Sequence, residues 1–280
     1  MPRHSAFLVT LLVSVAVNVT VASAQSRPLP VESVNGPGAG NVTLAIGFDV
    51  AHDVRYTLSG LEGDLWRVGL IRVDVGLSAI ADFELSGGLR DHLAITSQQP
   101  AVLSDLLRLS NPSATGAFDD AVVGTKVRLT AEDAERPGIS IRFATRLPNA
   151  KHPSGLGQNS MDFYSSLIIE KSYANTSVIA NIGWGSLGDP LRGNRHVASL
   201  LYSVAAQRPV SRALAVVAGV DGRTGPLESG LEARAIGRSG LRWHRAAIQI
   251  DAAATYGLTP RDGTIGAALT AAYTFHAFVP

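Results

Sequence analysis

Four cationic side chains between residues 126 and 146 have a spacing that could serve a solute. Lys126 and Arg128 are two residues apart, which places them on one face of a strand, and Arg142 and Arg146 share a face of the segment that follows. If the two segments pair as a hairpin, the four charges form one patch that attracts anionic solutes such as aromatic carboxylates. The alternative is structural pairing, in which nearby carboxylates neutralise the cations.

Carboxylates that could pair with these cations lie close by in the sequence. Asp120 precedes Lys126 on the same segment, and Asp162 and Glu170 lie on the segment after residue 146. Charges of both signs can pair across a protein interior or line a narrow wet pore. With one residue from the C-terminal region they complete the expected pore-lining set, which is Lys126, Arg128, Arg142, Arg146, Asp120, Asp162, Glu170 and Asp251.

Motifs for catalysis are sparse. Residues 183–188 match the Gly-x-Gly-x-x-Gly pattern, but no helical pattern follows them, as a dinucleotide site requires. His196 and Ser199 are three residues apart, so a strand places them on opposite faces. The chain has no cysteine, which excludes thiolate metal sites and a catalytic thiol. We therefore expect no catalytic residues, no cofactor and no metal.

The segments that carry these charges have apolar residues at every second position. Between residues 138 and 147, for example, Ile139, Ile141 and Phe143 alternate with polar residues. Since successive strand residues point to opposite faces, each such segment has one apolar and one polar face. We expect about twelve strands, near 41–50, 65–76, 82–93, 118–130, 138–147, 160–172, 177–186, 195–207, 211–221, 230–237, 240–257 and 263–278.

The connections between these strands favour a membrane barrel over a soluble β-sandwich. Those at 51–64, 94–117 and 148–159 are long and the alternate ones are short, as in outer-membrane barrels. A sandwich with an ordinary aromatic core is the alternative. The sequence predicts an all-β, transmembrane, antiparallel up-and-down β-barrel. Aromatic residues near the strand ends would form its interfacial girdles, namely Tyr164 or Phe163, Trp184, Tyr202, Trp243, Tyr256, Tyr273 and Phe275.

One of the long connections is a second candidate site. The segment 148–159 contains Lys151, His152, Gly155 and Gly157, and it can fold inward as a constriction loop or cap the rim of the barrel. Its Gly and Pro content is typical of turns.

The N-terminus has the pattern of a secretory signal peptide, residues 1–24. Arg3 and His4 precede an apolar run over residues 7–17, and small residues allow cleavage after Ala24. Residues 25–40, rich in Pro and Gly, are expected to be a periplasmic lead-in to a barrel over residues 41–280. The expected location is the outer membrane of a Gram-negative cell.

Composition limits the partners. The chain has 24 Lys and Arg against 23 Asp and Glu, whereas a nucleic-acid-binding protein carries a basic excess. Mean hydropathy is +0.17, which fits a signal peptide together with strands that turn one face to lipid. Near the C-terminus Tyr273, Phe275 and Ala277 alternate as in a signal for the barrel-assembly machinery, although Phe278 falls on the other face. The expected partners are therefore outer-membrane lipid, a small-molecule solute and that machinery, and the oligomeric state is open.

Residues 118–129, FDDAVVGTKVRL, resemble a Gly-Asp-x-x-x-Gly-x-Lys-Tyr-Arg-Leu strand in a Gram-negative outer-membrane family named for the meta-pathway of phenol degradation. Residues 146–164 are similar to its Lys-x-Pro and Gly-Leu-Gly-Thr-Gly-x-x-Asp stretch. The chain departs from these motifs at Asp119, Val127 and Asn159, and the resemblance covers about residues 118–186. It implies an outer-membrane barrel of transporter type that takes up small solutes, aromatic ones among them.

Residues and resemblance together predict a porin-like channel that passes small solutes, with anionic and aromatic ones as candidates, through a charge-lined lumen. Two alternatives stay open. One is an outer-membrane enzyme acting on lipid, since a nucleophile and its base can come from distant strands. The other is a plugged structural or adhesive barrel, since side chains can fill a small barrel.

Overall fold

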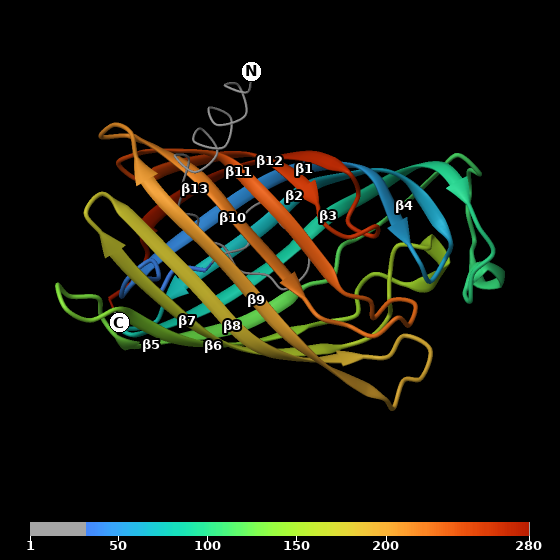
Figure 1. The fold of residues 1–280 in the computed structure, drawn as a ribbon, viewed down its shortest axis with the longest axis horizontal. Helices are drawn as coiled ribbons and strands as arrows, with labels where there is room; N and C mark the ends of the chain where they lie inside the picture. Colours follow the sequence, from blue (N-terminus) through green and yellow to red (C-terminus); the bar gives the residue numbers. More distant parts are fainter. Residues whose placement is uncertain (1–31, 280) are drawn as a thin grey trace, which may run out of the picture.

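The computed structural model describes residues 32–279, which form a closed antiparallel β-barrel (Figure 1). The strands are β1 (Asn41–Tyr56), β2 (Leu61–Gly76), β3 (Ala81–Gln98), β4 (Ala114–Ala117), β5 (Val122–Thr130), β6 (Gly138–Arg146), β7 (Asp162–Tyr173), β8 (Thr176–Gly188), β9 (His196–Pro209), β10 (Leu214–Arg223), β11 (Arg234–Arg245), β12 (Ile248–Gly257) and β13 (Ile265–His276). Two short 3₁₀ helices, η1 (Ser104–Leu106) and η2 (His152–Ser154), lie in connections. Within residues 32–279 no helix is long and apolar enough to cross a membrane.

The barrel wall closes through its first strands. β1 pairs with both β13 and β2, and β2 pairs in turn with β3. The short strand β4 adds only to the far end of β3, so twelve of the thirteen described strands form the ring. The predicted all-β, twelve-strand antiparallel barrel is therefore confirmed.

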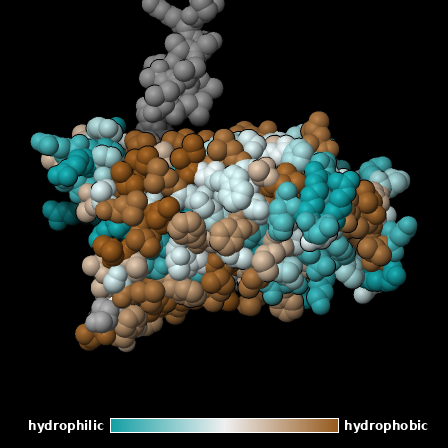
Figure 2. Space-filling view, turned by 90° about the horizontal axis from the view of Figure 1, so that it is seen from below, coloured by the Kyte–Doolittle hydropathy of each residue, from teal (hydrophilic) through white to brown (hydrophobic). Residues whose placement is uncertain are grey.

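The outer surface of the barrel is apolar, and charged side chains point inward. On β1, Leu44 and Ile46 are 44% and 58% exposed, whereas Asp49 on the other face is only 4% exposed. Figure 2 shows apolar residues over much of one side of the barrel, with hydrophilic residues gathered mainly toward its two ends. This is the reverse of a soluble protein and matches the lipid-facing band of a membrane barrel. Of the two alternative girdle residues, Phe163 faces outward and Tyr164 is buried.

The two ends of the barrel differ in the length of their connections. At the end called here the long-loop end, the segments 99–121 and 147–161 contain β4, η1 and η2. At the opposite, short-turn end the strands are joined by tight turns such as 174–175 and 246–247. The described chain begins and ends at the short-turn end, where Ala277 N donates a hydrogen bond to Gly40 O.

Two predicted boundaries are wrong. A turn was expected between strands 230–237 and 240–257, but β11 continues through these positions to Arg245 and the turn to β12 lies at residues 246–247. In this turn Ala246 has a φ of +52°. The turn contains only alanines, so no turn-forming residue type marked it. The expected long loop 51–64 is mostly strand, because β1 and β2 continue to a turn at residues 57–60. An irregularity between Ala51 and Val54 interrupts the alternation there and hides the strand.

Candidate functional site

The predicted cationic patch exists as a piece of the lumen wall. In the β5–β6 hairpin Lys126 lies directly opposite Arg142, and Val122 lies opposite Arg146. Lys126, Arg142 and Arg146 all point inward and are 4%, 6% and 4% exposed. Arg128 lies nearer the short-turn end, where it donates hydrogen bonds to Asn35 Oδ1 and Ala79 O. The hairpin thus brings Lys126 and Arg142 side by side, whereas Arg128 and Arg146 lie toward opposite ends of it.

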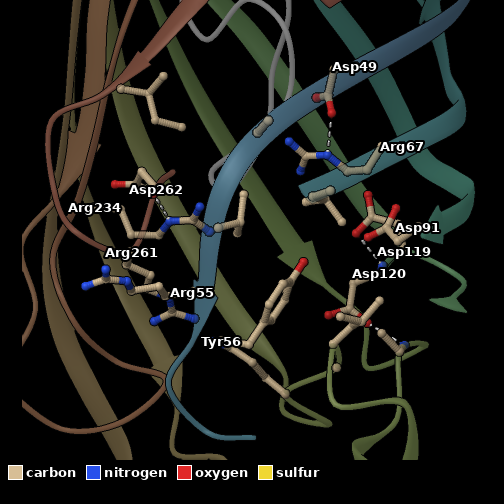
Figure 3. A pocket seen from close by; sticks show the side chains of 18 of the residues that line it. Asp49, Arg55, Tyr56, Arg67, Asp91, Asp119, Asp120, Arg234, Arg261 and Asp262 are labelled. Atoms are coloured by element: carbon tan, nitrogen blue, oxygen red, sulfur yellow. Dashed lines mark hydrogen bonds and ion pairs between the residues drawn. The ribbon is translucent and has the colours of Figure 1, made fainter. Parts of the chain in front are cut away.

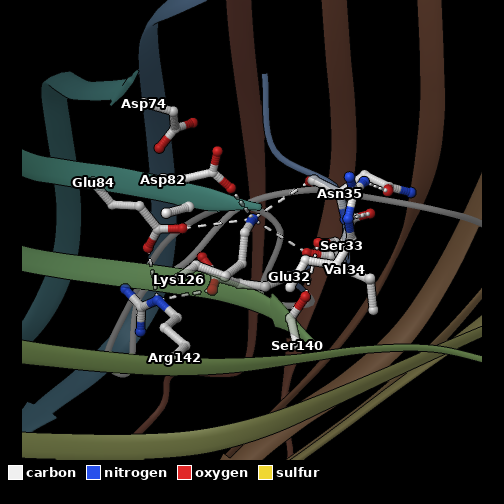
Figure 4. Close-up of polar contacts among 12 residues, drawn as sticks. Glu32, Ser33, Val34, Asn35, Asp74, Asp82, Glu84, Lys126, Ser140 and Arg142 are labelled. Atoms are coloured by element: carbon white, nitrogen blue, oxygen red, sulfur yellow. Dashed lines mark hydrogen bonds and ion pairs between the residues drawn. The ribbon is translucent and has the colours of Figure 1, made fainter. Parts of the chain in front are cut away.

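Each of these cations has a carboxylate or carbonyl partner. Arg142 Nε lies 2.7 Å from Glu84 Oε2 and 2.7 Å from Glu32 Oε2. Lys126 Nζ lies 3.6 Å from Glu84 Oε1, and Arg72 NH2 lies 3.7 Å from the same oxygen. We call these five residues the inner ion network, and Figure 4 shows all of them except Arg72. Buried charges are held in this way because an unpaired buried ion is costly.

A segment before the barrel enters the lumen and contacts this network. Residues 32–36, called here the lumen segment, come from the stretch expected as a periplasmic lead-in, of which 25–31 lie outside the described residues. Ser33 Oγ and Val34 N donate hydrogen bonds of 2.6 and 3.0 Å to Glu170 Oε2. Ser140 Oγ donates to Val34 O, and Lys126 Nζ donates to Ser33 O. The polar groups of the segment are therefore bonded to the lumen wall on several strands.

The side chain of Val34 anchors the lumen segment in an apolar niche. It is 2% exposed and packs against Ile168, Ile179 and Ala205 from β7, β8 and β9. Sequence reasoning missed this contact, because its partners lie more than 130 residues away and no local pattern marks it.

Arg146 belongs to a second buried cluster. Its NH2 donates a 2.7 Å hydrogen bond to Asp162 Oδ2, and its NH1 donates to Asp120 Oδ2. Tyr164 Oη donates to the same oxygen of Asp162, and Gly188 N donates to Asp162 Oδ1. On the other side of the ring Asp251 accepts two hydrogen bonds from Arg242. Every member of the predicted pore-lining set except Arg128 is thus buried and paired within the lumen.

An open space at the long-loop end, called here the outer cavity, measures about 1130 Å³ including the solvent at its opening. Asp49, Asp91 and Asp119 line one side of it, and Arg234 and Arg261 line the other (Figure 3). A second space, the inner cavity, lies beside the lumen segment and measures about 1010 Å³, again including open solvent.

Small residues separate the two cavities along one wall. On β1 the inner cavity reaches Ala45 and the outer cavity begins at Asp49, and the inward residue between them is Gly47. The same comparison gives Ala253 on β12, which lies directly opposite Gly240 on β11 and Ala268 on β13. We call these four residues the small-residue wall. The opposite wall, on β6 and β7, carries the bulky side chains of Arg142, Arg146 and Tyr164.

The predicted constriction loop lies at the mouth of the outer cavity. Gly155, Leu156 and Gly157 line this cavity, and Gly155 has a φ of +76°, which favours glycine. His152, in η2, makes a 2.8 Å hydrogen bond with Gln158 O, whereas Lys151 points to the exterior and is exposed.

Sequence reasoning did not select Asp91 and Arg67, because a bulge changes which residues face inward. At Gly69, with a φ of +68°, β2 shifts by one residue against β1. On β2 the inward-facing residues have odd numbers before the bulge and even numbers after it. On β3 the change runs the other way, from even numbers near its start to odd numbers from Asp91 onward. Uninterrupted alternation from Glu84 would place Arg90 inside the lumen, but Arg90 is exposed and its neighbour Asp91 is buried instead. Glycines at 69, 87 and 88 were the available signal, since an isolated strand glycine often marks a bulge.

In the described part of the chain no group of three or more His, Cys, Asp or Glu side chains is placed to hold a metal ion.

Comparison with known proteins places the fold. No protein-family model and no curated protein matches the chain, so the resemblance over residues 118–186 has no family match behind it. Among solved structures, the chain is similar to the COG4313 outer membrane channel from Pseudomonas putida F1. That likeness has a TM-score of 0.62 at 14% identity and covers 91% of this chain and 100% of that one.

Two further structures show weaker similarity. The translocator domain of autotransporter NalP from Neisseria meningitidis has a TM-score of 0.44 at 11% identity, covering 85% of this chain and 89% of that one. The CymD monoaromatic hydrocarbon channel has a TM-score of 0.40 at 10% identity, covering 86% and 90%. The chain therefore has the fold of an outer-membrane β-barrel, with its apolar belt embedded in lipid.

Proposed function

We propose that the protein is an outer-membrane channel that lets small polar solutes cross the bilayer along the small-residue wall. One observation carries this proposal: the lumen has a cavity toward each end, and on β1 and β12 the inward residues between the two cavities are the small Gly47 and Ala253. The fold shared with the COG4313 outer membrane channel supports the same conclusion. No reaction chemistry is required, because passage needs only a wet path of sufficient width.

The path suits small solutes because the rest of the lumen is filled. Strands lie about 4.8 Å apart and tilt by about 40°, so a ring of twelve has a diameter of roughly 24 Å between backbones. The inner ion network, Tyr164 and the lumen segment occupy much of that width on the β3-to-β8 side. We place the path beside Ala253 and Ala268, because their side chains are small and both belong to the small-residue wall.

The experiment is single-channel conductance in planar bilayers with substitutions at the small-residue wall. We expect the native protein to conduct, and Ala253→Trp or Ala268→Trp to lower its conductance several-fold, because an indole there fills the gap. Ala252→Trp is the matched control, since Ala252 is the next residue of β12 and is exposed on the lipid side. Native protein that does not conduct, or equal conductance in all variants, contradicts the proposal.

A closed structural barrel is the second candidate, and the lumen segment is the observation that favours it. Glu32, Ser33 and Val34 are each less than 9% exposed and fill the inner half of the lumen on one side. In that case the native protein gives a flat trace, and deletion of residues 32–36 produces conductance where there was none.

A further inference from the structure

We propose that the outer surface of the barrel binds the headgroup of an anionic phospholipid at the short-turn end, between the ends of β9 and β11. The residues that hold this headgroup are Arg208, Arg212 and Arg245, called here the arginine rim. The site lies outside the proposed solute path, because it faces the lipid that surrounds the barrel.

The three arginines lie on neighbouring strand ends. Arg208 is the second-to-last residue of β9, Arg212 lies in the turn to β10, and Arg245 is the last residue of β11. Because β10 pairs with both β9 and β11, the ends of these three strands are adjacent. His244 N donates a 2.9 Å hydrogen bond to Ala213 O, which holds the β9–β10 turn against the end of β11.

Two of the arginines point away from the lumen. On β9 the inward residues Ser203 and Ala205 are buried, and Arg208 lies on the opposite face. On β11 the inward residue Arg242 is buried, and Arg245 lies on the opposite face. Neither strand shifts its register against its neighbours, so the alternation holds to the end of each strand. Arg208 and Arg245 are exposed and therefore face the surrounding membrane.

No acidic residue neutralises the arginine rim. Within residues 32–279 none of its three guanidinium groups takes part in an ion pair or a side-chain hydrogen bond. The stretches around them, 196–220 and 234–257, contain a single acidic residue, Asp251. Asp251 faces inward, where Arg242 binds it. The positive charge of the rim is therefore available to a partner outside the chain.

Other exposed cations at the short-turn end are paired with carboxylates. In the β5–β6 turn Arg136 Nε lies 3.3 Å from Asp133 Oδ2. Lys171, beside the same turn, lies 3.8 Å from Glu132 Oε1. The uncompensated charge at the ends of β9 and β11 is thus a local feature and not a property of every cation at this end.

Apolar side chains lie directly beside the arginine rim. Trp243 is two residues before Arg245 on the same outward face, and Leu214 of β10 lies opposite Trp243. Val216, the next outward residue of β10, lies opposite Arg208. An indole favours the membrane–water interface, which places the arginines at the depth of the headgroups. The surface therefore offers cations to a headgroup and, next to them, apolar contacts to its acyl chains.

The chemistry of the rim favours a phosphate ester with net negative charge. A guanidinium donates two parallel hydrogen bonds to phosphate oxygens. Short turns of outer-membrane barrels lie on the periplasmic side, so the lipid that reaches the rim is phospholipid of that leaflet. A zwitterionic phospholipid has the same phosphate, but its own ammonium group cancels the charge. Each guanidinium near the surface therefore favours the anionic lipid by about fivefold.

The test uses Trp243 as a local reporter of the lipid beside the rim. The chain has three tryptophans, and Trp66→Phe with Trp184→Phe leaves Trp243 alone. The protein with these changes is placed in phosphatidylcholine vesicles in which a fixed minor share of the lipid is brominated, as either phosphatidylglycerol or phosphatidylcholine. Bromine quenches indole fluorescence only at close range, so comparison of the two lipids gives their relative binding constant beside Trp243.

We expect phosphatidylglycerol to bind beside Trp243 at least about fivefold more strongly than phosphatidylcholine. The triple change Arg208→Gln, Arg212→Gln and Arg245→Gln should bring this ratio close to one. Equal quenching by the two lipids in the protein with an intact rim overturns the inference. A ratio that survives the triple change also overturns it.

Two controls show whether the preference is local. Arg136→Gln removes an exposed but paired cation at the same end and should leave the ratio unchanged. With Trp66→Phe and Trp243→Phe, the remaining Trp184 faces outward on β8 toward the long-loop end and should report a ratio near one. An equal preference at Trp184, or an equal loss in Arg136→Gln, overturns the inference.

Folding of each variant is checked by its heat-dependent shift in gel migration. If the triple variant fails to fold, the single substitution Arg245→Gln, at the exposed end of β11, replaces it. This substitution should lower the ratio by about fivefold, since it removes one guanidinium. An unchanged ratio in the folded Arg245→Gln protein overturns the inference.

Discussion

At the residue scale, Arg146 is the best example of how the lumen keeps its charges paired. It is 4% exposed and bonded to Asp120 and Asp162, and Asp162 in turn accepts hydrogen bonds from Tyr164 and Gly188. A buried cation held by several strands joins β6 to β7 and to the segment before β5. Its contribution is structural whether or not solutes pass beside it.

Removing this cation should destabilise the barrel. Arg146→Ala leaves two buried carboxylates without their cation, and loss of one partner of a buried pair costs about 3–5 kcal/mol. We expect the free energy of unfolding in lipid vesicles, measured by urea titration, to fall by about that amount. Arg136→Ala is the control, since Arg136 and its partner Asp133 are both exposed and such surface ion pairs contribute little to stability. An equal loss of unfolding free energy in both variants would contradict a stabilising role for Arg146.

At the element scale, the lumen segment is joined to its surroundings by charge as well as by packing. Glu32 faces Arg72 from β2, Glu84 from β3, Lys126 from β5 and Arg142 from β6. Burial raises the pKa of Glu32 to about 7, with a further contribution from Glu84, against the pull of the three cations. The docked segment therefore binds a proton more tightly than the same carboxyl in water.

This shift gives the docking of the lumen segment a definite pH dependence. A free glutamate has a pKa of about 4.5, so acid favours the docked form, and docking weakens as pH rises from about 4.5 to 7. We expect conductance in planar bilayers to rise between pH 5 and pH 8. Glu32→Gln should remove most of this rise, whereas Glu135→Gln, in an exposed turn, should keep it. An unchanged pH response in Glu32→Gln would assign the effect to another group.

At the scale of the whole molecule, stability depends on the outward face of the barrel. Large apolar side chains such as Trp66, Ile182 and Leu269 are about half exposed, at 49%, 55% and 51%. In water, an apolar surface of this size would promote aggregation. In lipid the same belt is solvated by acyl chains, and the closed ring leaves no strand edge without hydrogen bonds.

A charge placed in this belt should be costly. Leu269 lies near the middle of β13, so Leu269→Arg should lower the free energy of unfolding in lipid vesicles by about 2–4 kcal/mol. Ile265→Arg, at the end of the same strand, should cost at most about 1 kcal/mol, because the penalty falls toward the interfaces. An equal loss of unfolding free energy at both positions would contradict a bilayer whose midplane lies near the middle of β13.

The sequence by itself determined the class of the barrel, because alternation is a local property. Residues such as Leu44 and Asp49 differ in polarity, and a strand sends them to opposite faces wherever it lies in the fold. The approximate number of strands, the outward apolar face and the inward direction of Lys126 and Arg142 in the β5–β6 hairpin followed from that periodicity.

Only the tertiary structure decided which charges meet. The bulge at Gly69 changed the inward set on β2 and β3, and closure of the ring brought the Asp91 side to face the Arg234 side. The lumen segment found Glu170 and Ile168 more than 130 residues away. Such contacts depend on register, bulges and ring closure, and these are set by all strands together, so no local pattern can encode them.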